Sequence, residues 1–288
     1  MIFYKIDWAP NEVFLKLGPL AIHWYSLMFI VAFTLGYYII KRIYQNENKS
    51  VDLVEPLFIY VVFGTLIGAR LGEVFFYNWD YFQNNLIEIF LPIKKDPNAS
   101  LLFGNISGYK FVGFRGLASH GATIGIISAM FLYKYKFKFD SVLWIFDRIV
   151  IPISVGGMFV RIGNFFNSEI VGNYTGNNFG IIFSNRGEIY PRHPAQLYEA
   201  FGYLILFIIL RYLYWKTDLG KKKGFIFGFF LICLFSIRVL VEFVKESQGG
   251  GIEDYLGILS TGQWLSIPFI LLGALLILNS KRKINSTL

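Results

Sequence analysis

The sequence has little charge, one cysteine and few histidines. Only 16% of its 288 residues are charged and 55% are hydrophobic, whereas soluble domains carry about 25% charged residues. Because Cys233 is the single cysteine, an intrachain disulfide and a cysteine-bound metal cluster are excluded, and we interpret its thiol as a packing group. Residues 1–10 do not resemble a cleavable signal peptide, so we expect the first apolar run to be retained.

The chain instead contains several long runs of apolar residues. About 20 apolar residues in a helix cross the roughly 30 Å hydrocarbon core of a bilayer. We therefore expect an all-α, polytopic integral membrane protein with a single membrane domain over residues 1–288. Its seven transmembrane helices are expected near residues 20–40, 53–77, 117–133, 142–162, 196–214, 225–244 and 264–278.

The basic residues predict the orientation of these spans. The net charge of +8 comes from clusters between apolar runs, so no nucleic-acid partner is expected. Most of these clusters fall on the side of the C-terminus, and the positive-inside rule then places the C-terminus inside and the N-terminus outside. Two long connections, residues 78–116 and 163–195, fall on the outer side, where we expect irregular or short-helical loops that carry function.

Small residues also follow a pattern within the spans. Glycines recur at a spacing of four residues, which allows helix backbones to approach closely in lipid. We interpret this pattern as packing, at Gly64, Gly68 and Gly72, at Gly121 and Gly125, and at Gly224 and Gly228.

Ionisable and polar residues in the spans are few and share one depth. An arginine at the centre of a membrane helix costs about 2.5–3.5 kcal/mol on insertion scales, so such residues need partners and mark function. Counting 1.5 Å per residue puts polar groups of five spans in the outer third of the bilayer: Tyr25, Arg70 with Glu73, His120, Arg161 with Asn164, Asn167 and Glu169, and Arg238 with Glu242. Asp147 and Arg148 fall near the inner side, and we interpret them as a structural pair at a helix end.

Each group also has a structural interpretation. Arg238 with Glu242, or Arg70 with Glu73, have the spacing of an intrahelical ion pair, and Tyr25 could be an interfacial aromatic. Together, however, the arginines suit an anionic phosphate, and a histidine at that depth could accept a proton. The chemistry alone favours a phospholipid-using transferase at the outer leaflet.

Two other classes of protein compete with the transferase. A transporter or channel would need a polar path to the inner side, where the spans are apolar apart from Asp147 and Arg148. A different lipid enzyme, such as a phosphatase, would need a metal site or an acidic cluster. The three histidines are dispersed, so no metal and no cofactor are expected.

One segment resembles a family signature. Residues 161–172 read RIGNFFNSEIVG, which is similar to the signature of the prolipoprotein diacylglyceryl transferases. Other matching pieces follow in order: HWY at 23–25, GARLG at 68–72, YN at 77–78, SHG at 119–121, RHPAQLYE at 192–199, and Arg238 with Glu242. The resemblance covers nearly the whole chain and implies the same layout of seven helices with the N-terminus outside.

The resemblance also implies an activity. Members of this family act in the bacterial cytoplasmic (inner) membrane, with the active site towards the periplasm. They transfer the diacylglyceryl group of phosphatidylglycerol to the lipobox cysteine of a prolipoprotein signal peptide. A thioether forms and glycerol 1-phosphate leaves. The expected partners are therefore phosphatidylglycerol, prolipoprotein signal peptides and the lipid bilayer.

The resemblance assigns roles to the polar residues. It implies His120 as the general base and Arg161 and Arg238 as phosphate-binding residues. The remaining matches are Tyr25 and Glu242 as catalytic positions, Asn164, Glu169 and Gly172 as phosphatidylglycerol-binding positions, and Arg70, Asn167, Arg192 and His193 as possible site residues. We expect Gly172 to mark a close backbone approach that a side chain would block.

The chain departs from the family pattern at two places. Relatives commonly have Gly-Gly after the histidine, where this chain has Gly121 and Ala122. The position three residues after Arg70 is often tyrosine and is Glu73 here. This leaves two interpretations of Arg70 open, a phosphate ligand or the partner of Glu73.

Overall fold

A computed structural model describes residues 5–17, 20–101, 106–112, 118–246 and 259–285. The side chains of Ser119 and His120 lie outside this description. The chain divides into two compact units. Unit 1 comprises Met1–Glu47 and Leu143–Leu288, and unit 2 comprises Asn48–Val142.

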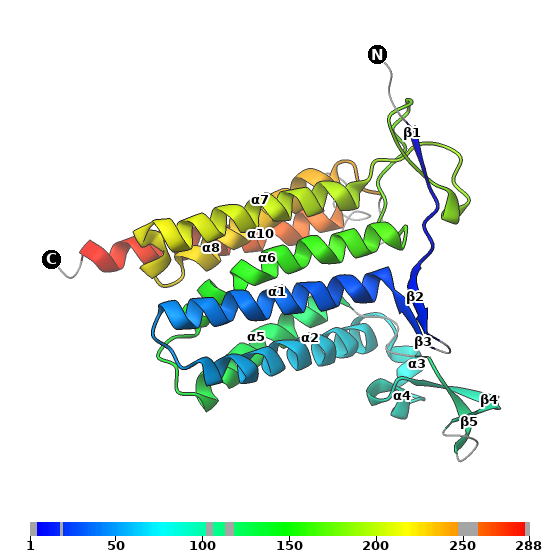
Figure 1. Cartoon of the computed structure of the whole chain (residues 1–288), viewed down its shortest axis with the longest axis horizontal. Coiled ribbons are helices and arrows are strands. Elements are labelled where there is room, and N and C mark those ends of the chain that lie inside the picture. The colour runs from blue at the N-terminus through cyan, green and yellow to red at the C-terminus, as the bar shows by residue number, and fades with distance from the viewer. Residues whose placement is uncertain (1–4, 18–19, 102–105, 113–117, 247–258, 286–288) are drawn as a thin grey trace. The chain divides into compact units, whose positions relative to one another are not determined.

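Long helices are the main elements of both units (Figure 1). Unit 1 contains α1 (Trp24–Asn46), α6 (Val142–Phe166), α7 (Ala195–Lys216), α8 (Phe225–Glu242) and α10 (Thr261–Asn285). Unit 2 contains α2 (Val54–Phe76) and α5 (Ser119–Lys136). Within unit 1, α8 packs against both α7 and α10.

Within the part of the chain that the structure describes, six helices are long and apolar enough to cross a membrane, which confirms an integral membrane protein. They are Trp24–Asn46, Val51–Phe75, Val142–Phe166, Ala195–Lys216, Phe225–Glu242 and Thr261–Ser280. The expected third span corresponds to α5, which is not among the six. Its composition explains the difference, because this 18-residue helix contains glycines near its start and Lys134 and Lys136 in its last turn.

The glycine spacing produces the predicted packing in unit 2. A Cβ atom added to Gly68 would lie 2.4 Å from the carbonyl oxygen of Gly121 and 2.7 Å from Cα of Gly125. One added to Gly64 would lie 2.9 Å from the carbonyl oxygen of Gly125. The backbones of α2 and α5 are therefore in contact, and only glycine fits at these positions.

The connections contain strands as well as the short helices that the sequence predicted. Short helices occur at α3 (Trp79–Phe82) and α4 (Ile87–Phe90), and β4 (Ile93–Leu101) pairs with β5 (Ile106–Phe111). In unit 1, β2 (Val13–Leu17) pairs with β3 (Leu20–His23), and β1 (Lys5–Trp8) pairs in parallel with β6 (Gly180–Phe183). The expectation of irregular or short-helical loops over 78–116 and 163–195 was thus right for α3 and α4 and wrong for β4, β5 and β6.

Long-range contacts explain why β1 and β6 were not expected. Their register joins Lys5 to Gly180 and Trp8 to Phe183, so neither strand has a partner nearby in the sequence. The Trp8 indole stacks on Phe165 with ring centroids 4.4 Å apart and donates to its carbonyl oxygen at 3.0 Å. This contact anchors the N-terminal segment to the end of α6.

A buried polar cluster lies at the beginning of α6. Arg148 forms an ion pair with Glu47 at 2.8 Å, and the same carboxylate accepts hydrogen bonds from Trp144 and Tyr214, both at 2.8 Å. Asp147 accepts from the backbone N–H groups of Gly224 at 2.7 Å and Phe227 at 2.8 Å, at the beginning of α8. A structural role for Asp147 and Arg148 agrees with these contacts, because they join α1, α6, α7 and α8.

Candidate active site

The residues of the signature converge at the end of α6. Arg161 donates to Oδ1 of Asn164 at 3.0 Å, and Asn164 donates to a carboxylate oxygen of Glu169 at 2.7 Å. Asn167 adds a longer bond of 3.4 Å to the same oxygen. The chain turns back after α6 through Ser168 and Ile170, which have φ of 53° and 58°. This turn brings Glu169 over the last turn of the helix.

Tyr25 joins this group from the first turn of α1. A side-chain hydrogen bond connects it to Asn164. A Cβ atom on Gly163 would lie 2.7 Å from Cδ2 of the Tyr25 ring, so the glycine makes room for the tyrosine. Because Asn164 is only 3% exposed, it is the buried centre that connects Tyr25, Arg161 and Glu169.

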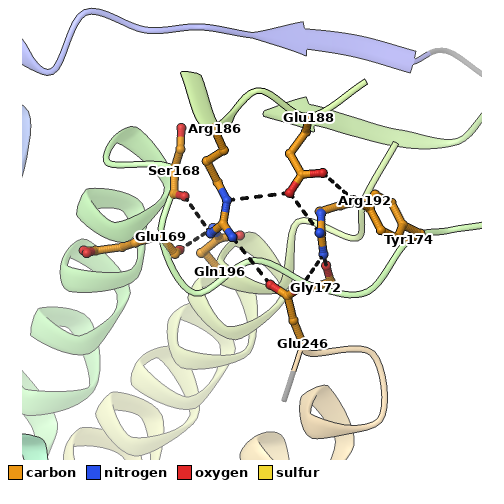
Figure 2. Close-up of polar contacts among 9 residues, drawn as sticks. All are labelled: Ser168, Glu169, Gly172, Tyr174, Arg186, Glu188, Arg192, Gln196 and Glu246. Atoms are coloured by element: carbon orange, nitrogen blue, oxygen red, sulfur yellow. Dashed lines mark hydrogen bonds and ion pairs between the residues drawn. The ribbon is translucent and has the colours of Figure 1, made fainter. Parts of the chain in front are cut away.

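The sequence analysis gave no role to three residues of this site on α7, although Gln196 and Glu199 lie in the matching piece 192–199. Glu199 forms an ion pair with Arg161, and a side-chain hydrogen bond joins Tyr203 to the same guanidinium. Gln196 donates to the backbone carbonyl of Glu169 at 2.6 Å (Figure 2). These residues follow the helical spacing i, i+3, i+7, which puts them on one face of α7. Polar residues at that spacing in an apolar helix were the signal that could have found them.

Arg238 lies on α8. The charges of Arg161 and Arg238 both interact electrostatically with the Tyr203 hydroxyl. Within the described part of the chain, Nε of Arg238 is buried without a hydrogen-bond partner. Tyr203 thus connects the surroundings of the two arginines that the sequence predicted as phosphate ligands.

Glu242 has partners other than Arg238. Its carboxylate lies 3.6 Å from the ammonium group of Lys245, and a Cβ atom on Gly262 would lie 2.6 Å from Oε1. Among the described residues, the structure shows no ion pair between Arg238 and Glu242, so the intrahelical pair considered from the sequence is not formed. The carboxylate lies instead against the first turn of α10, where a helix dipole favours negative charge.

The segment that connects α6 to α7 is held by a network around Arg192, which is 5% exposed. Arg192 forms ion pairs with Glu188 at 2.8 Å and Glu246 at 2.9 Å, and its guanidinium lies 3.9 Å from the centre of the Tyr174 ring (Figure 2). Burial alone would raise the pKa of Glu188, but hydrogen bonds from Tyr174 and Arg192 outweigh it and hold the pKa below its ordinary value of 4.5.

Gly172 lies where two other segments meet the signature loop. Its N–H donates to the carbonyl oxygen of His193 at 2.9 Å, and Arg192 donates to the carbonyl of Gly172 at 3.1 Å. A Cβ atom at Gly172 would lie 2.6 Å from the carbonyl oxygens of both His193 and Val244. The expected close backbone approach at this glycine is therefore present.

Two predicted site residues belong to unit 2. The backbone of His120 lies in the first turn of α5, but its side chain lies outside the described residues, so its role as general base stays a prediction. Arg70 donates through Nε to the carbonyl of Ile89 at 3.1 Å and through a second nitrogen to the carbonyl of Glu88. These bonds, and a ring contact with Phe82 at 4.7 Å, attach α2 to the short helices α3 and α4.

The alternative partner considered for Arg70 has a contact of its own. The Glu73 carboxylate accepts a hydrogen bond of 2.7 Å from the amide of Asn78. Arg70 therefore has a structural function in holding the segment that follows α2.

The fold and the site define a class of protein. Six apolar helices, with arginines, carboxylates and amides gathered at the end of α6, describe an integral membrane protein with a polar site suited to an anionic group.

Comparison with known proteins identifies the family. The family model for prolipoprotein diacylglyceryl transferase matches residues 12–279. Relatives named phosphatidylglycerol–prolipoprotein diacylglyceryl transferase include one from Tolumonas auensis, 37% identical over 96% of this chain and 98% of the relative. Others are from Chloroherpeton thalassium, 39% identical over 96% and 95%, and Bacteroides fragilis, 39% identical over 94% of both chains. This chain belongs to the prolipoprotein diacylglyceryl transferase family.

Proposed function

We propose that this protein transfers the diacylglyceryl group of phosphatidylglycerol to the lipobox cysteine of prolipoproteins in the bacterial inner membrane. The names of the relatives supply the lipid and the protein substrate. The observation that carries the proposal is the network of Tyr25, Arg161 and Glu169 around the buried Asn164, because it gathers the residues of the family signature into one polar site.

The proposed reaction is a substitution at an sp³ carbon. The cysteine thiol loses its proton to a base, and the thiolate sulfur forms a bond to the terminal glycerol carbon of the diacylglyceryl group. The bond from that carbon to the phosphate oxygen breaks, and its electron pair leaves with glycerol 1-phosphate. A thiol of ordinary pKa near 8.5 needs such a base, and we assign this role to His120.

The arginines bind the phosphate group of the lipid. Fixed cationic donors in a site that excludes water act strongly on the charge of such a group and on charge that develops in a transition state. We assign contacts with the phosphate to Arg161 and Arg238, with Tyr25, Asn164, Glu169 and Glu242 as supporting residues. Gly172 shapes the loop, and Asn167, Arg192 and His193 are further candidates at its edge. Arg70 is a further candidate for a lipid contact, although the backbone carbonyl groups of Glu88 and Ile89 already accept hydrogen bonds from its guanidinium.

We further propose that α5 is a seventh span and that the chain is one membrane domain with the N-terminus outside. The lysines in the last turn of α5 support an inner end there, under the positive-inside rule. This orientation puts the end of α6 that carries Arg161 towards the periplasm, where the lipobox cysteine of an exported prolipoprotein is accessible.

A reconstitution experiment tests the function. The purified protein is placed in vesicles that contain phosphatidylglycerol, a lipobox peptide is added, and the peptide mass is followed by mass spectrometry. We expect a mass gain of one diacylglyceryl group with the cysteine peptide and none with the matched cysteine-to-serine peptide. No gain with several anionic lipids would overturn the proposal.

A further inference from the structure

The ion pair between Arg161 and the buried Glu199 adds to the site a residue that lies outside the signature segment 161–172. Glu199 lies on α7, is 2% exposed, and its carboxylate contacts Nε of Arg161. A second edge of the guanidinium donates to Asn164 at 3.0 Å. Tyr203, one turn after Glu199, supplies a third contact. Arg161 is thus held from both α6 and α7.

Stability alone does not account for such a pair. Removing two charges from water is costly, and apolar residues of similar volume in place of a buried pair are often neutral or stabilising. The face of α7 that carries Gln196, Glu199 and Tyr203 contacts the Arg161 guanidinium and the backbone of the loop after α6. Gly157 contributes as well, because a Cβ atom there would lie 3.2 Å from the Tyr203 ring. The whole face is therefore shaped to orient Arg161 and its loop.

The two arginines of the site differ in charge compensation. Glu199 compensates the charge of Arg161 at contact distance. Arg238 has no ion pair among the described residues, and its Nε has no hydrogen-bond partner there. A guanidinium without an ion-pair partner attracts the phosphate of a bound anionic lipid. A guanidinium that a carboxylate neutralises and holds in place adds little to this binding. It can still stabilise the negative charge that develops on the leaving phosphate in the transition state.

We propose that Glu199 is a positioning residue for the transfer reaction: it holds Arg161 in the orientation that stabilises the departing phosphate, while Arg238 supplies the attraction for bound phosphatidylglycerol. The inference rests on the proposed function and assigns the two arginines different steps. Loss of Glu199 then lowers turnover and spares lipid binding, whereas loss of Arg238 weakens lipid binding.

The test separates KM from kcat. Initial rates of lipobox-peptide modification are measured against the mole fraction of phosphatidylglycerol in vesicles diluted with phosphatidylcholine. For Glu199→Gln we expect kcat to fall at least tenfold while KM for phosphatidylglycerol changes less than threefold. Glu199→Asp keeps the charge on a shorter side chain and should recover part of the lost kcat. Arg238→Ala should raise KM at least tenfold.

A matched control comes from a second buried pair of unit 1, far from the site. Glu47 pairs with Arg148 near the beginning of α6, about 20 Å along the helix from Arg161 at 1.5 Å per residue. Glu47→Gln removes an equivalent interaction, so it should lower the thermal unfolding temperature of the purified protein and leave kcat and KM within twofold.

The outcomes distinguish the two proposals. Wild-type protein that modifies no peptide overturns the proposed function and this role of Glu199 with it. Active wild-type protein with a Glu199→Gln variant of unchanged kcat overturns the role of Glu199 alone. The role of Glu199 is also overturned if Glu199→Gln lowers only the unfolding temperature, as Glu47→Gln does. It is overturned as well if Glu199→Gln raises KM as much as Arg238→Ala does.

Discussion

Replacing Asn164 by leucine removes the centre of the site at nearly constant volume. The amide accepts a hydrogen bond from Arg161 at 3.0 Å and donates one to Glu169 at 2.7 Å. Hydrogen bonds to charged groups contribute about 1.5–3 kcal/mol each, so the two together contribute about 3–6 kcal/mol. The substitution leaves a buried guanidinium and a carboxylate each short of a partner.

We expect part of this energy to appear as a lower free energy of unfolding and part as weaker stabilisation of the transition state. If about half of the lower figure is lost from transition-state stabilisation, the rate falls at least tenfold, since 1.36 kcal/mol corresponds to a factor of ten. Asn167→Leu breaks only the 3.4 Å bond to Glu169 and should lower the rate less than threefold.

The assay measures peptide modification in phosphatidylglycerol vesicles together with thermal unfolding of the same preparations. Asn46→Leu serves as the control, because this amide makes only a 3.5 Å contact with Tyr214 at the end of α1 and should change neither quantity. An Asn164→Leu enzyme with a rate within threefold of wild type would refute the reasoning, since Arg161 and Glu169 would then keep their function without the amide.

Further predictions concern the base, the arginine, acid stability and metal ions. His120→Ala should abolish transfer at near-normal protein levels; substantial turnover, followed by peptide mass, would exclude it as the base. Arg238→Lys should lower kcat/KM at least tenfold, because ammonium cannot reproduce a forked contact with phosphate; a mild loss in the vesicle assay would indicate a simple charge role. The pKa of Glu188 is held below 4.5, so its stabilising contribution is complete above pH 4.5 and is lost as the pH falls through the lower folded-state pKa. Thermal unfolding of Glu188→Gln should accordingly depend less on pH below 4.5 than that of wild type. A chelator should leave activity unchanged; complete loss that one divalent metal restores would contradict this expectation.

The membrane character and most of the signature site were predictable from residue types. Helices that cross lipid must be apolar over about 20 residues whatever their neighbours are, so the runs mark the spans directly. Polar residues are costly there, which made Tyr25, Arg161 and Arg238 conspicuous. The spacing of Arg161 and Asn164 also placed them on one helix face before any tertiary contact was known.

Contacts between segments far apart in the chain were not predictable in this way. The pairing of β1 with β6 joins residues near the N-terminus to residues near 180. Arg70 binds backbone carbonyls of α4, which no side-chain pattern encodes. The carboxylate of Glu242, four residues after Arg238, pairs instead with Lys245 and lies against the start of α10.

The sequence by itself determined that this chain is a membrane protein with an arginine-containing site and the signature of a lipid-modifying family. Only the tertiary structure decided that Arg161 meets Glu199 and that Nε of Arg238 is buried without a hydrogen-bond partner among the described residues. The physical reason is that apolar length and helical spacing are properties of one segment. The partner of a buried charge depends instead on how two helices are rotated and packed against each other.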